Sequence, residues 1–274
     1  MALPVPAPDR TALITGASSG IGAELARQLA SRGHGVTLVA RREDRLRSLA
    51  EDLSSRHNVR AEVLAVDLTD LDARTSLPDR LESLGLEAAV LVNNAGFSTS
   101  GPVAKSDPAK EVAMIRTDVE AVAHLCSLFL PAMVRHDAGG ILNVASTAAF
   151  QPLPGQSGYG ACKAFVLSYT HGLRGELHGT KVAATVLCPG PVQTEFATTA
   201  GFTAADEAMM PGFMWVPAAD VARQAIDGLA SNRAVVIPGT ANKMAAMSGY
   251  LTPRSVLVPM LARRHPSLHQ HEPG

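Results

Sequence analysis

The segment "YGACK", residues 159–163, places a phenol and an ammonium group four residues apart. On a helix, residues i and i+4 lie on one face with their Cβ atoms about 5–6 Å apart. A tyrosine beside a cation is a candidate acid or base, because a nearby positive charge favours the phenolate. Taken alone, the pair is better explained as an exposed tyrosine beside a solvated lysine, so the rest of the chain must decide.

A glycine-rich segment, "TGASSGIG" (15–22), follows a short apolar run and opens a helical pattern. Glycines let the backbone turn tightly and approach a ligand, and a helix N-terminus attracts a pyrophosphate. The spacing G-x-x-x-G-x-G is neither the usual G-x-G-x-x-G fingerprint nor a P-loop. Packing between strand and helix would also use glycines, but the position after the first strand favours a nucleotide site. The residues expected to hold the nucleotide are Gly16, Ser18, Ser19, Gly20, Ile21 and Gly22.

The second apolar run ends in "VARRED" (39–44), with Arg41 and Arg42 near the position where a carboxylate would bind the ribose of NAD. A guanidinium can bind the 2′-phosphate of NADP through two hydrogen bonds. The alternative is that both arginines begin a solvated helix and pair with Glu43 and Asp44, which suits Arg42 better than Arg41. The pattern therefore favours NADP(H) over NAD(H).

Short apolar runs alternate with helical patterns along the whole chain, without repeats or a change in composition. Strands that are apolar throughout and joined by helices indicate a parallel sheet covered on both faces. We therefore expect one α/β domain over residues 1–274, with a doubly wound sheet of seven parallel strands. The expected strands are 11–15, 35–40, 61–67, 88–96, 140–146, 181–190 and 234–239, and the expected helices are 20–32, 42–56, 108–136, 159–177 and 218–230.

The motifs, in this order, resemble the short-chain dehydrogenase/reductase family over about residues 10–195. The resemblance rests on the glycine-rich segment, Asp67-Leu68, "NNAG" (93–96), "NVAS" (143–146), "YGACK" and "PGPVQT" (189–194). It implies a Rossmann-like fold, a nicotinamide cofactor and the interconversion of a carbonyl and an alcohol. It further implies that Asp67 and Leu68 contact the adenine. The other residues that the resemblance assigns to the cofactor are Asn94, Ala95, Gly96, Pro189, Gly190, Val192 and Thr194, the last two facing the nicotinamide carboxamide.

The resemblance assigns a chemical role to Tyr159 and Lys163. Free tyrosine has a pKa of about 10, too high for an effective base near neutral pH, and Lys163 would favour its phenolate. Tyr159 would be the general acid in reduction and the general base in oxidation. Ser146, at the end of the fifth strand, would donate a hydrogen bond to the substrate oxygen. By resemblance, Lys163 would also hold the ribose hydroxyls of the nicotinamide half, so Tyr159 and Lys163 count as cofactor contacts too.

One position departs from the family pattern. The long helix of the family usually carries an asparagine that completes a proton path through water and the lysine. Alignment of "MIRTDVEAVAHL" (114–125) places Asp118 there. Its carboxylate could accept hydrogen bonds, but its negative charge would partly cancel the effect of Lys163 on Tyr159.

By the same resemblance, residues of about 195–216 form a lid over the substrate. A C-terminal extension, about 240–274, ends the sequence. Residues that could line an apolar pocket, or alternatively pack the lid onto the body, are Phe150, Met209, Met210, Phe213, Met214 and Trp215. Methionines conform to irregular shapes, so a lipophilic ketone or alcohol is a plausible substrate. The apolar and basic extension could lie on a membrane surface, contact another subunit or pack on the body.

Composition sets outer bounds on function. The net charge of −1 gives no support for nucleic-acid binding, and no run of about 20 apolar residues predicts a membrane span. Cys126, Cys162 and Cys188 form no metal-ligand pattern and are expected as free thiols, with a packing role favoured for Cys162. His269 and His271 do not make a metal site. We expect a cytoplasmic protein without a metal and, by resemblance, a homodimer or homotetramer.

Two other functions compete with this interpretation. A regulator could bind NADP without turning it over, although Ser146, Tyr159 and Lys163 are all present. A sugar-nucleotide epimerase or dehydratase on a related fold would need more chain after the sixth strand than this sequence offers.

Overall fold

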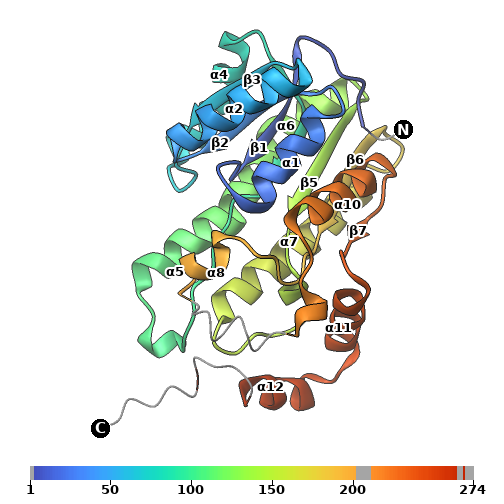
Figure 1. The fold of residues 1–274 in the computed structure, drawn as a ribbon. Coiled ribbons are helices and arrows are strands. Elements are labelled where there is room, and N and C mark those ends of the chain that lie inside the picture. Colours follow the sequence, from blue (N-terminus) through green and yellow to red (C-terminus); the bar gives the residue numbers. More distant parts are fainter. Residues whose placement is uncertain (1–2, 202–210, 264–267, 269–274) are drawn as a thin grey trace.

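The computed structural model describes residues 3–201, 211–263 and 268 of the chain. A twisted sheet lies at the centre and helices cover it on both sides (Figure 1). Its strands are β1 (Arg10–Thr15), β2 (Gly35–Ala40), β3 (Ala61–Ala65), β4 (Glu87–Asn93), β5 (Gly139–Val144), β6 (Val182–Leu187) and β7 (Val235–Val236).

All strands of this sheet run parallel, in the order β3-β2-β1-β4-β5-β6-β7. The expected seven-stranded, doubly wound parallel sheet is therefore confirmed. The chain changes direction across the sheet between β1 and β4, and folds of this type bind ligands at such a reversal, beyond the carboxyl ends of the strands.

The helices form two layers, one on each face of the sheet. On one face, α1, α2 and α10 pack around Leu25, Leu46 and Ile226. On the other, α4, α6 and α7 pack around Leu81, Phe129 and Leu173. The longer helices are α1 (Gly20–Ala30), α2 (Glu43–His57), α4 (Leu77–Ser83), α5 (Pro108–Ile115), α6 (Ala121–Arg135), α7 (Ser157–Glu176), α10 (Ala218–Ala230), α11 (Thr240–Leu251) and α12 (Arg254–Ala262). The short ones are α3 (Leu71–Thr75), α8 (Glu195–Thr199) and the 3₁₀ turns η1 (Val103–Lys105), η3 (Thr147–Phe150) and η4 (Gly212–Met214).

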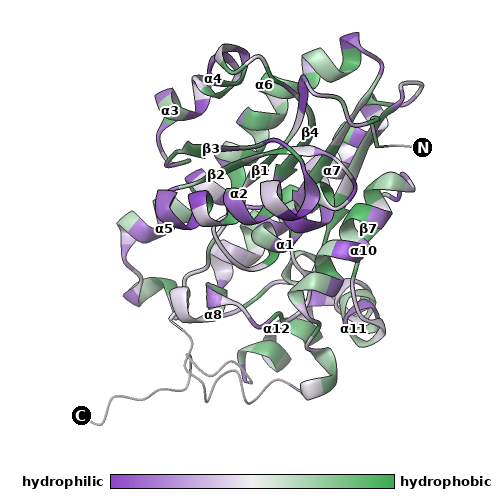
Figure 2. Ribbon diagram, turned by 45° about the horizontal axis from the view of Figure 1, so that its top comes forward, coloured by the Kyte–Doolittle hydropathy of each residue, from purple (hydrophilic) through white to green (hydrophobic). Residues whose placement is uncertain are grey.

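The burial of the strands explains why they read as continuous apolar runs. Every residue of β5 and β6 is buried, because helices cover both faces of the sheet. Figure 2 shows the strands green inside the molecule, while hydrophilic purple marks the outward face of helices such as α2. Leu38 in β2 has no exposed surface and packs in the core beneath α1 and α2.

Several expected elements have different limits. The helix expected over 108–136 contains a π-helical turn, η2 (Arg116–Glu120), between α5 and α6. The strand expected to reach residue 190 ends at Leu187, shortly before Pro189, and the one expected to reach residue 239 ends at Val236, two residues before Pro238. Proline has no N–H to donate to a neighbouring strand, so β6 and β7 both end shortly before their prolines.

One helical stretch of the described residues, Pro108–Arg135, is long and apolar enough to cross a membrane by length and composition. Its α6 part packs on the sheet through Leu125, Phe129 and Met133. This packing explains the apolar character of the buried side of the α6 part.

Replacing Leu38 with alanine should lower the free energy of unfolding by about 2–5 kcal/mol, because the change leaves a cavity in a fully packed core. Leu71→Ala, on an exposed side chain of α3, is the matched control and should change stability by less than about 0.5 kcal/mol. Urea unfolding measures both. Equal effects of the two substitutions would contradict the assigned core.

Candidate active site

The residues singled out from the sequence gather at one edge of the sheet. The loops that follow the carboxyl ends of β1, β2, β3, β4 and β6 carry the expected cofactor contacts, and Ser146 follows β5. Because the strands are parallel and adjacent, these loops lie side by side along the edge.

The glycine turn after β1 is shaped by close backbone contacts. Gly16 has a φ of 65°, and a Cβ there would lie 2.8 Å from the Cα of Ala95. A Cβ on Gly22 would lie 2.3 Å from the carbonyl oxygen of Gly16. Both positions therefore require glycine, one for its conformation and both for space.

The "NNAG" segment after β4 holds this turn in place. The side-chain amide of Asn94 donates to the carbonyl oxygens of Thr15, at 3.0 Å, and Gly16, at 3.3 Å. In return, the hydroxyl of Thr15 accepts hydrogen bonds from the backbone N–H groups of Asn94 and Ala95. The two loops are thus fixed against each other, beneath the N-terminus of α1.

The N-terminus of α1 fits an anionic group. Ser19 precedes the helix without capping it through its side chain. Among the described residues, no acceptor receives the N–H groups of Gly20, Ile21 or Gly22. Unpaired N–H groups at a helix N-terminus, together with the helix dipole, favour a phosphate at this position.

Arg42 turns toward the glycine turn. Its guanidinium donates to the hydroxyl of Ser18 at 3.0 Å and to that of Ser19 at 2.8 Å, and it pairs with Glu195 at 2.7 Å. The alternative interpretation, in which Arg42 pairs with Glu43 or Asp44, differs from these contacts, and Glu43 pairs with Arg47 on the next turn of α2 instead.

Arg41 is exposed and faces Asp67. Burial raises the pKa of Asp67, but hydrogen bonds from the N–H and hydroxyl of Thr69, helped by the charge of Arg41, lower that pKa below its ordinary value. Asp67 is therefore a carboxylate at neutral pH. The neighbouring Leu68 is buried.

Sequence reasoning missed a buried arginine behind this loop. Arg74 has no exposed surface, and its guanidinium donates to the carbonyl oxygens of Leu68, at 2.8 Å, and Arg116, at 3.3 Å. It also pairs with Glu120. Arg74 thus ties the Asp67-Leu68 loop to the π-helical turn. A lone arginine among polar residues gives no signal of such a role.

Lys163 is the buried cation of the site. The residue is 4% exposed, and its ammonium group lies 3.3 Å from the Asp118 carboxylate and 3.2 Å from the carbonyl oxygen of Val144. It also lies 5.6 Å from the centre of the Tyr159 ring. Burial lowers the pKa of Lys163, but the charges of Asp118 and Tyr159 raise it more, so the ammonium form is favoured.

Tyr159 lies on the same buried face of α7. Burial raises the pKa of its phenol, while Lys163 and a hydrogen bond with Ser146 lower it and Asp118 raises it. In the chain alone the burial effect is the larger, so the pKa lies above its ordinary value. Lys163 acts in the expected direction but does not by itself make the phenolate accessible.

Asp118 lies in the middle of the π-helical turn η2 and is fully buried. Besides Lys163, its carboxylate accepts a hydrogen bond from the N–H of Phe97 at 3.3 Å. A Cβ on Gly96 would lie 2.1 Å from its Oδ1 atom, so the glycine of "NNAG" leaves the space that Asp118 fills. Burial raises the pKa of Asp118, and Lys163 opposes that rise.

Ser146 caps the turn η3, where its hydroxyl accepts a hydrogen bond from the N–H of Ala148 at 3.1 Å. The hydroxyl is also 3.5 Å from the carbonyl oxygen of Pro189. The structure therefore brings together Ser146 at the start of η3, Tyr159 and Lys163 of α7, and Asp118 of η2.

The loop after β6 contacts both the glycine turn and the C-terminal extension. Thr194 caps α8 and lies against Gly20, where a Cβ would be 3.1 Å from its methyl group, and Val192 packs against the core. A Cβ on Gly190 would lie 2.4 Å from the amide of Asn242, a fully buried residue of α11. Asn242 in turn donates to the carbonyl oxygens of Met214 and Pro238. Sequence reasoning missed Asn242, because one asparagine in an apolar helix carries no distinctive spacing.

The expected pocket residues have mixed positions. The ring of Phe196, in α8, lies 5.6 Å from that of Tyr159. Phe213 is 76% exposed and does not pack on the body, whereas Phe150, Met214 and Trp215 are partly buried. Met209 and Met210 lie outside the described residues, as do His269 and His271.

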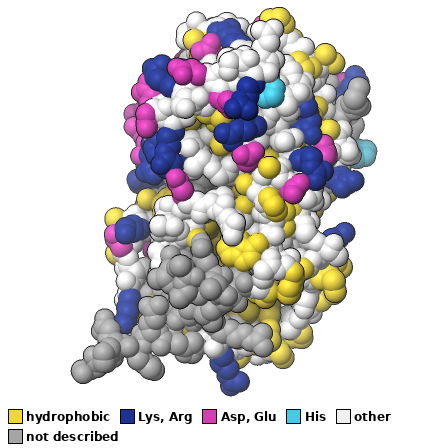
Figure 3. All heavy atoms as spheres, in the orientation of Figure 1, with side chains coloured by type: hydrophobic (Ala, Val, Ile, Leu, Met, Phe, Trp, Pro, Cys, Tyr) yellow, Lys and Arg dark blue, Asp and Glu magenta, His cyan; other side chains and the backbone are white. Residues whose placement is uncertain are grey.

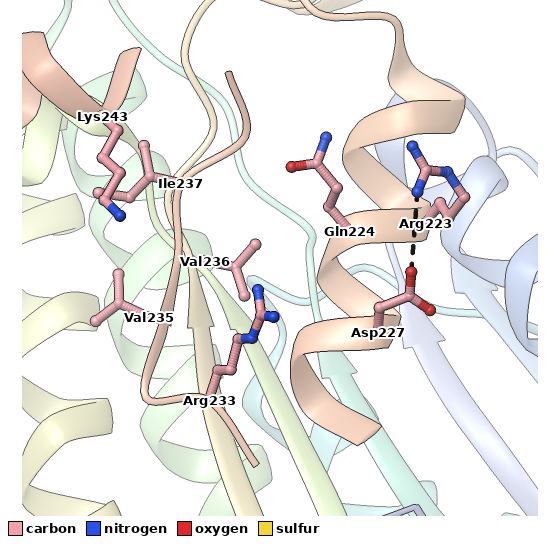
Figure 4. Close-up of a pocket in the computed structure, with 8 residues that line it drawn as sticks. All are labelled: Arg223, Gln224, Asp227, Arg233, Val235, Val236, Ile237 and Lys243. Carbon is pink, nitrogen blue, oxygen red and sulfur yellow. Dashed lines mark ion pairs between the residues drawn. The ribbon is translucent and has the colours of Figure 1, made fainter. Parts of the chain in front are cut away.

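A separate cavity of about 400 Å³ lies between α10, β7 and α11. Figure 4 shows Arg223 and Asp227 of α10 facing it from one side, and Val236 and Lys243 from the other. It contains none of the expected site residues, and its guanidinium, carboxylate and ammonium groups are solvent-exposed.

The three cysteines are buried and free. Burial raises the pKa of Cys162 to about 11, so its thiol is protonated at neutral pH. This agrees with the favoured packing role rather than with reactivity.

The fold is doubly wound α/β, and the expected site residues lie at the carboxyl edge of its sheet. A family model described as short chain dehydrogenase matches residues 10–203. Sulfoacetaldehyde reductase 2 of Chromohalobacter salexigens is 39% identical over 214 residues, which are 77% of this chain and 84% of the relative.

Two solved structures support the same assignment. A short-chain dehydrogenase from Sphingobium yanoikuyae, in complex with NADPH, matches with a TM-score of 0.78 and 33% identity, over 91% of this chain and 95% of that one. A bulky-bulky ketone specific alcohol dehydrogenase from Comamonas testosteroni matches with a TM-score of 0.73 and 28% identity, over 93% and 96%. The chain belongs to the short chain dehydrogenase family, and it is an oxidoreductase of the alcohol–carbonyl class.

Replacing Asp118 with asparagine should move the pH profile of alcohol oxidation to lower pH. The Asp118 carboxylate raises the pKa of Tyr159, so its removal lowers that pKa, and the phenolate that oxidation requires forms at lower pH. The reduction profile should fall off at lower pH for the same reason.

Steady-state rates measured between about pH 6 and 11 in both directions test this shift around the pKa of tyrosine. Asp220→Asn, the same substitution at an exposed and distant site on α10, is the control and should leave both profiles in place. Superimposed profiles for the wild type and Asp118→Asn would show that the carboxylate does not act on Tyr159.

Proposed function

We propose that this protein is an NADP(H)-dependent oxidoreductase that interconverts a carbonyl and an alcohol on a lipophilic substrate. The observation that carries the proposal is the buried group formed by Tyr159, Lys163 and Asp118, with the Ser146 hydroxyl beside the phenol. A purely structural role gives no reason for three ionisable groups to be buried in contact at the ligand-binding edge of the sheet.

The cofactor would lie along this edge. The free N–H groups of Gly20, Ile21 and Gly22 would bind its pyrophosphate, and Asp67 with Leu68 would lie against the adenine. At the other end, Asn94, Ala95 and Gly96 would lie beneath the cofactor. The remaining proposed contacts are Gly16, Ser18, Ser19, Tyr159, Lys163, Pro189, Gly190, Val192 and Thr194.

The arginines support NADP(H) over NAD(H). Arg41 and Arg42 follow β2, and the Asp67 carboxylate beyond β3 is already engaged by Thr69. Arg42 already donates to the serines of the glycine turn, so a 2′-phosphate beside that turn would meet a guanidinium. The NADPH complex of the Sphingobium relative supports the same preference.

In reduction, the bound nicotinamide supplies the hydride. Tyr159 donates its proton to the carbonyl oxygen, and Ser146 donates a hydrogen bond to the same oxygen as charge develops there. Lys163 stabilises the phenolate that remains, held in position by Asp118 and the carbonyl of Val144. In oxidation, Tyr159 removes the proton from the alcohol.

A lipophilic substrate is supported by the apolar surroundings of the phenol. Tyr159 is packed with Met114, Ala148 and Cys162, and Phe97, Leu153 and Phe196 lie around them. The bulky ketones named for the Comamonas structure agree with this choice. Sulfoacetaldehyde, named for the Chromohalobacter relative, is the polar competitor.

We also propose one domain for the whole chain, with residues 195–216 as the lid. A homo-oligomer formed through the α5 and α7 helices is supported by the exposed apolar side chains of Val112, Ile115 and Phe165.

Tyr159→Phe should reduce NADPH-dependent carbonyl reduction by about 10²–10⁴-fold, the contribution of a positioned acid. Tyr169→Phe removes a hydroxyl from the same helix and should retain activity. NADPH oxidation is followed spectrophotometrically with long-chain and cyclic ketones, with aldehydes and quinones, and with sulfoacetaldehyde. Equal activity of the two variants would refute the acid role, and turnover confined to sulfoacetaldehyde would refute the lipophilic substrate.

Arg41→Asp should weaken NADPH binding by about tenfold or more while NADH binding changes little, because only NADPH carries the phosphate that a guanidinium binds. Cofactor fluorescence titration gives both dissociation constants. Arg45→Asp is the control: Arg45 pairs with Glu195 like Arg42 but contacts no serine of the turn. Equal losses for both cofactors would remove Arg41 from the 2′-phosphate site.

A further inference from the structure

The outward face of the C-terminal extension is apolar. Together with Phe213 of η4 it forms a surface that we call the extension face, which consists of Phe213, Met244, Met247, Tyr250, Leu251, Val256 and Met260. In α11, Met244, Met247 and Leu251 recur at helical spacing and are 68%, 55% and 73% exposed. Tyr250 is 67% exposed beside them. Figure 3 shows hydrophobic side chains gathered over the region where Figure 1 places α11, and Figure 2 colours much of α11 and α12 as hydrophobic.

This face is held rigidly by the opposite side of α11. Asn242, Ala246 and Gly249 are buried there, and a Cβ on Gly249 would lie 2.4 Å from the side chain of Gln151. Arg254 then fixes the start of α12 through hydrogen bonds from its guanidinium to the carbonyl oxygens of Gly249 and Phe150. The large apolar side chains are therefore presented to solvent by an anchored element.

Every charged residue in the described continuous part of the C-terminal extension, residues 240–263, is positive. Residues 240–263 contain Lys243, Arg254 and Arg263 and no aspartate or glutamate, in a chain whose net charge is −1. Large apolar side chains with a tyrosine, bordered by cations, are the combination that binds the interface of an anionic bilayer.

A second copy of the chain is a poorer occupant. A two-fold contact uses the same surface on both subunits, so it would bring these cations toward one another. The extension face offers no carboxylate to compensate them. Anionic lipid headgroups would instead neutralise all three.

We propose that the extension face docks this protein on the surface of an anionic lipid bilayer, with α11 and α12 lying in the interface and no segment crossing it. Phe213 belongs to η4, which Asn242 connects to α11 through the carbonyl of Met214. Docking would therefore place the C-terminal end of the lid, and with it the nicotinamide end of the site, next to the membrane. This inference does not depend on the proposed function.

The test is sedimentation of the full-length protein with vesicles, in the absence of cofactor and substrate. Vesicles of phosphatidylcholine with about 30 mol% phosphatidylglycerol should bind the protein, and added salt should weaken the binding. The double variant Met247→Glu/Leu251→Glu should bind at least about tenfold more weakly. Leu71→Glu, which adds a carboxylate at an exposed leucine of α3, is the matched control and should bind like the wild type.

Circular dichroism and thermal unfolding verify that both variants are folded, and sedimentation equilibrium gives their masses. The proposal is overturned if the wild type binds no vesicles, if it binds pure phosphatidylcholine equally well, or if the double variant binds unchanged. A fall in mass of the double variant alone would also overturn it, since the face would then be a subunit contact. An inactive protein that binds vesicles would contradict only the proposed function.

Discussion

The site depends on the need to neutralise one buried cation. An ammonium group without solvent is costly unless anionic and polar partners surround it, and Lys163 has the Asp118 carboxylate and the carbonyl of Val144. These partners come from the π-helical turn and from β5, so satisfying one side chain fixes three elements relative to one another. Tyr159, one helical turn from Lys163, is positioned by the same arrangement.

The local backbone is adapted to this pairing. A π-helical turn adds a residue to the helical repeat and is frequent at functional sites. Here it directs Asp118 beneath Gly96, at a place where any side chain would collide with the carboxylate. The space left at Gly96 and the π-helical turn thus both allow the Asp118 carboxylate to lie beside the Lys163 ammonium group.

Much of the fold could be predicted from the sequence, because buried parallel strands are read directly as apolar runs. Strand ends were predicted less well, as at Pro189 and Pro238, where the missing N–H rather than hydrophobicity ends the pairing. The residues of the glycine turn and the Tyr159–Lys163 pair could be found because their roles impose spacing. Arg74 and Asn242 could not, because each acts through partners distant in sequence and leaves no local pattern. The partners of Arg42 could not be predicted either, because Glu195 lies 153 residues further along the chain.

Arg42 belongs to two parts of the molecule at once, because it contacts both the serines of the glycine turn and Glu195 at the first turn of α8. With Arg45 it holds the pKa of Glu195 at about 2, so that carboxylate remains charged at any physiological pH. An anion that binds Arg42 must share the guanidinium with Glu195. The binding of the anion and the pairing of Arg42 with Glu195 therefore affect each other by the same free energy. The binding of an anion beside the glycine turn is therefore linked, through Arg42, to the position of α8.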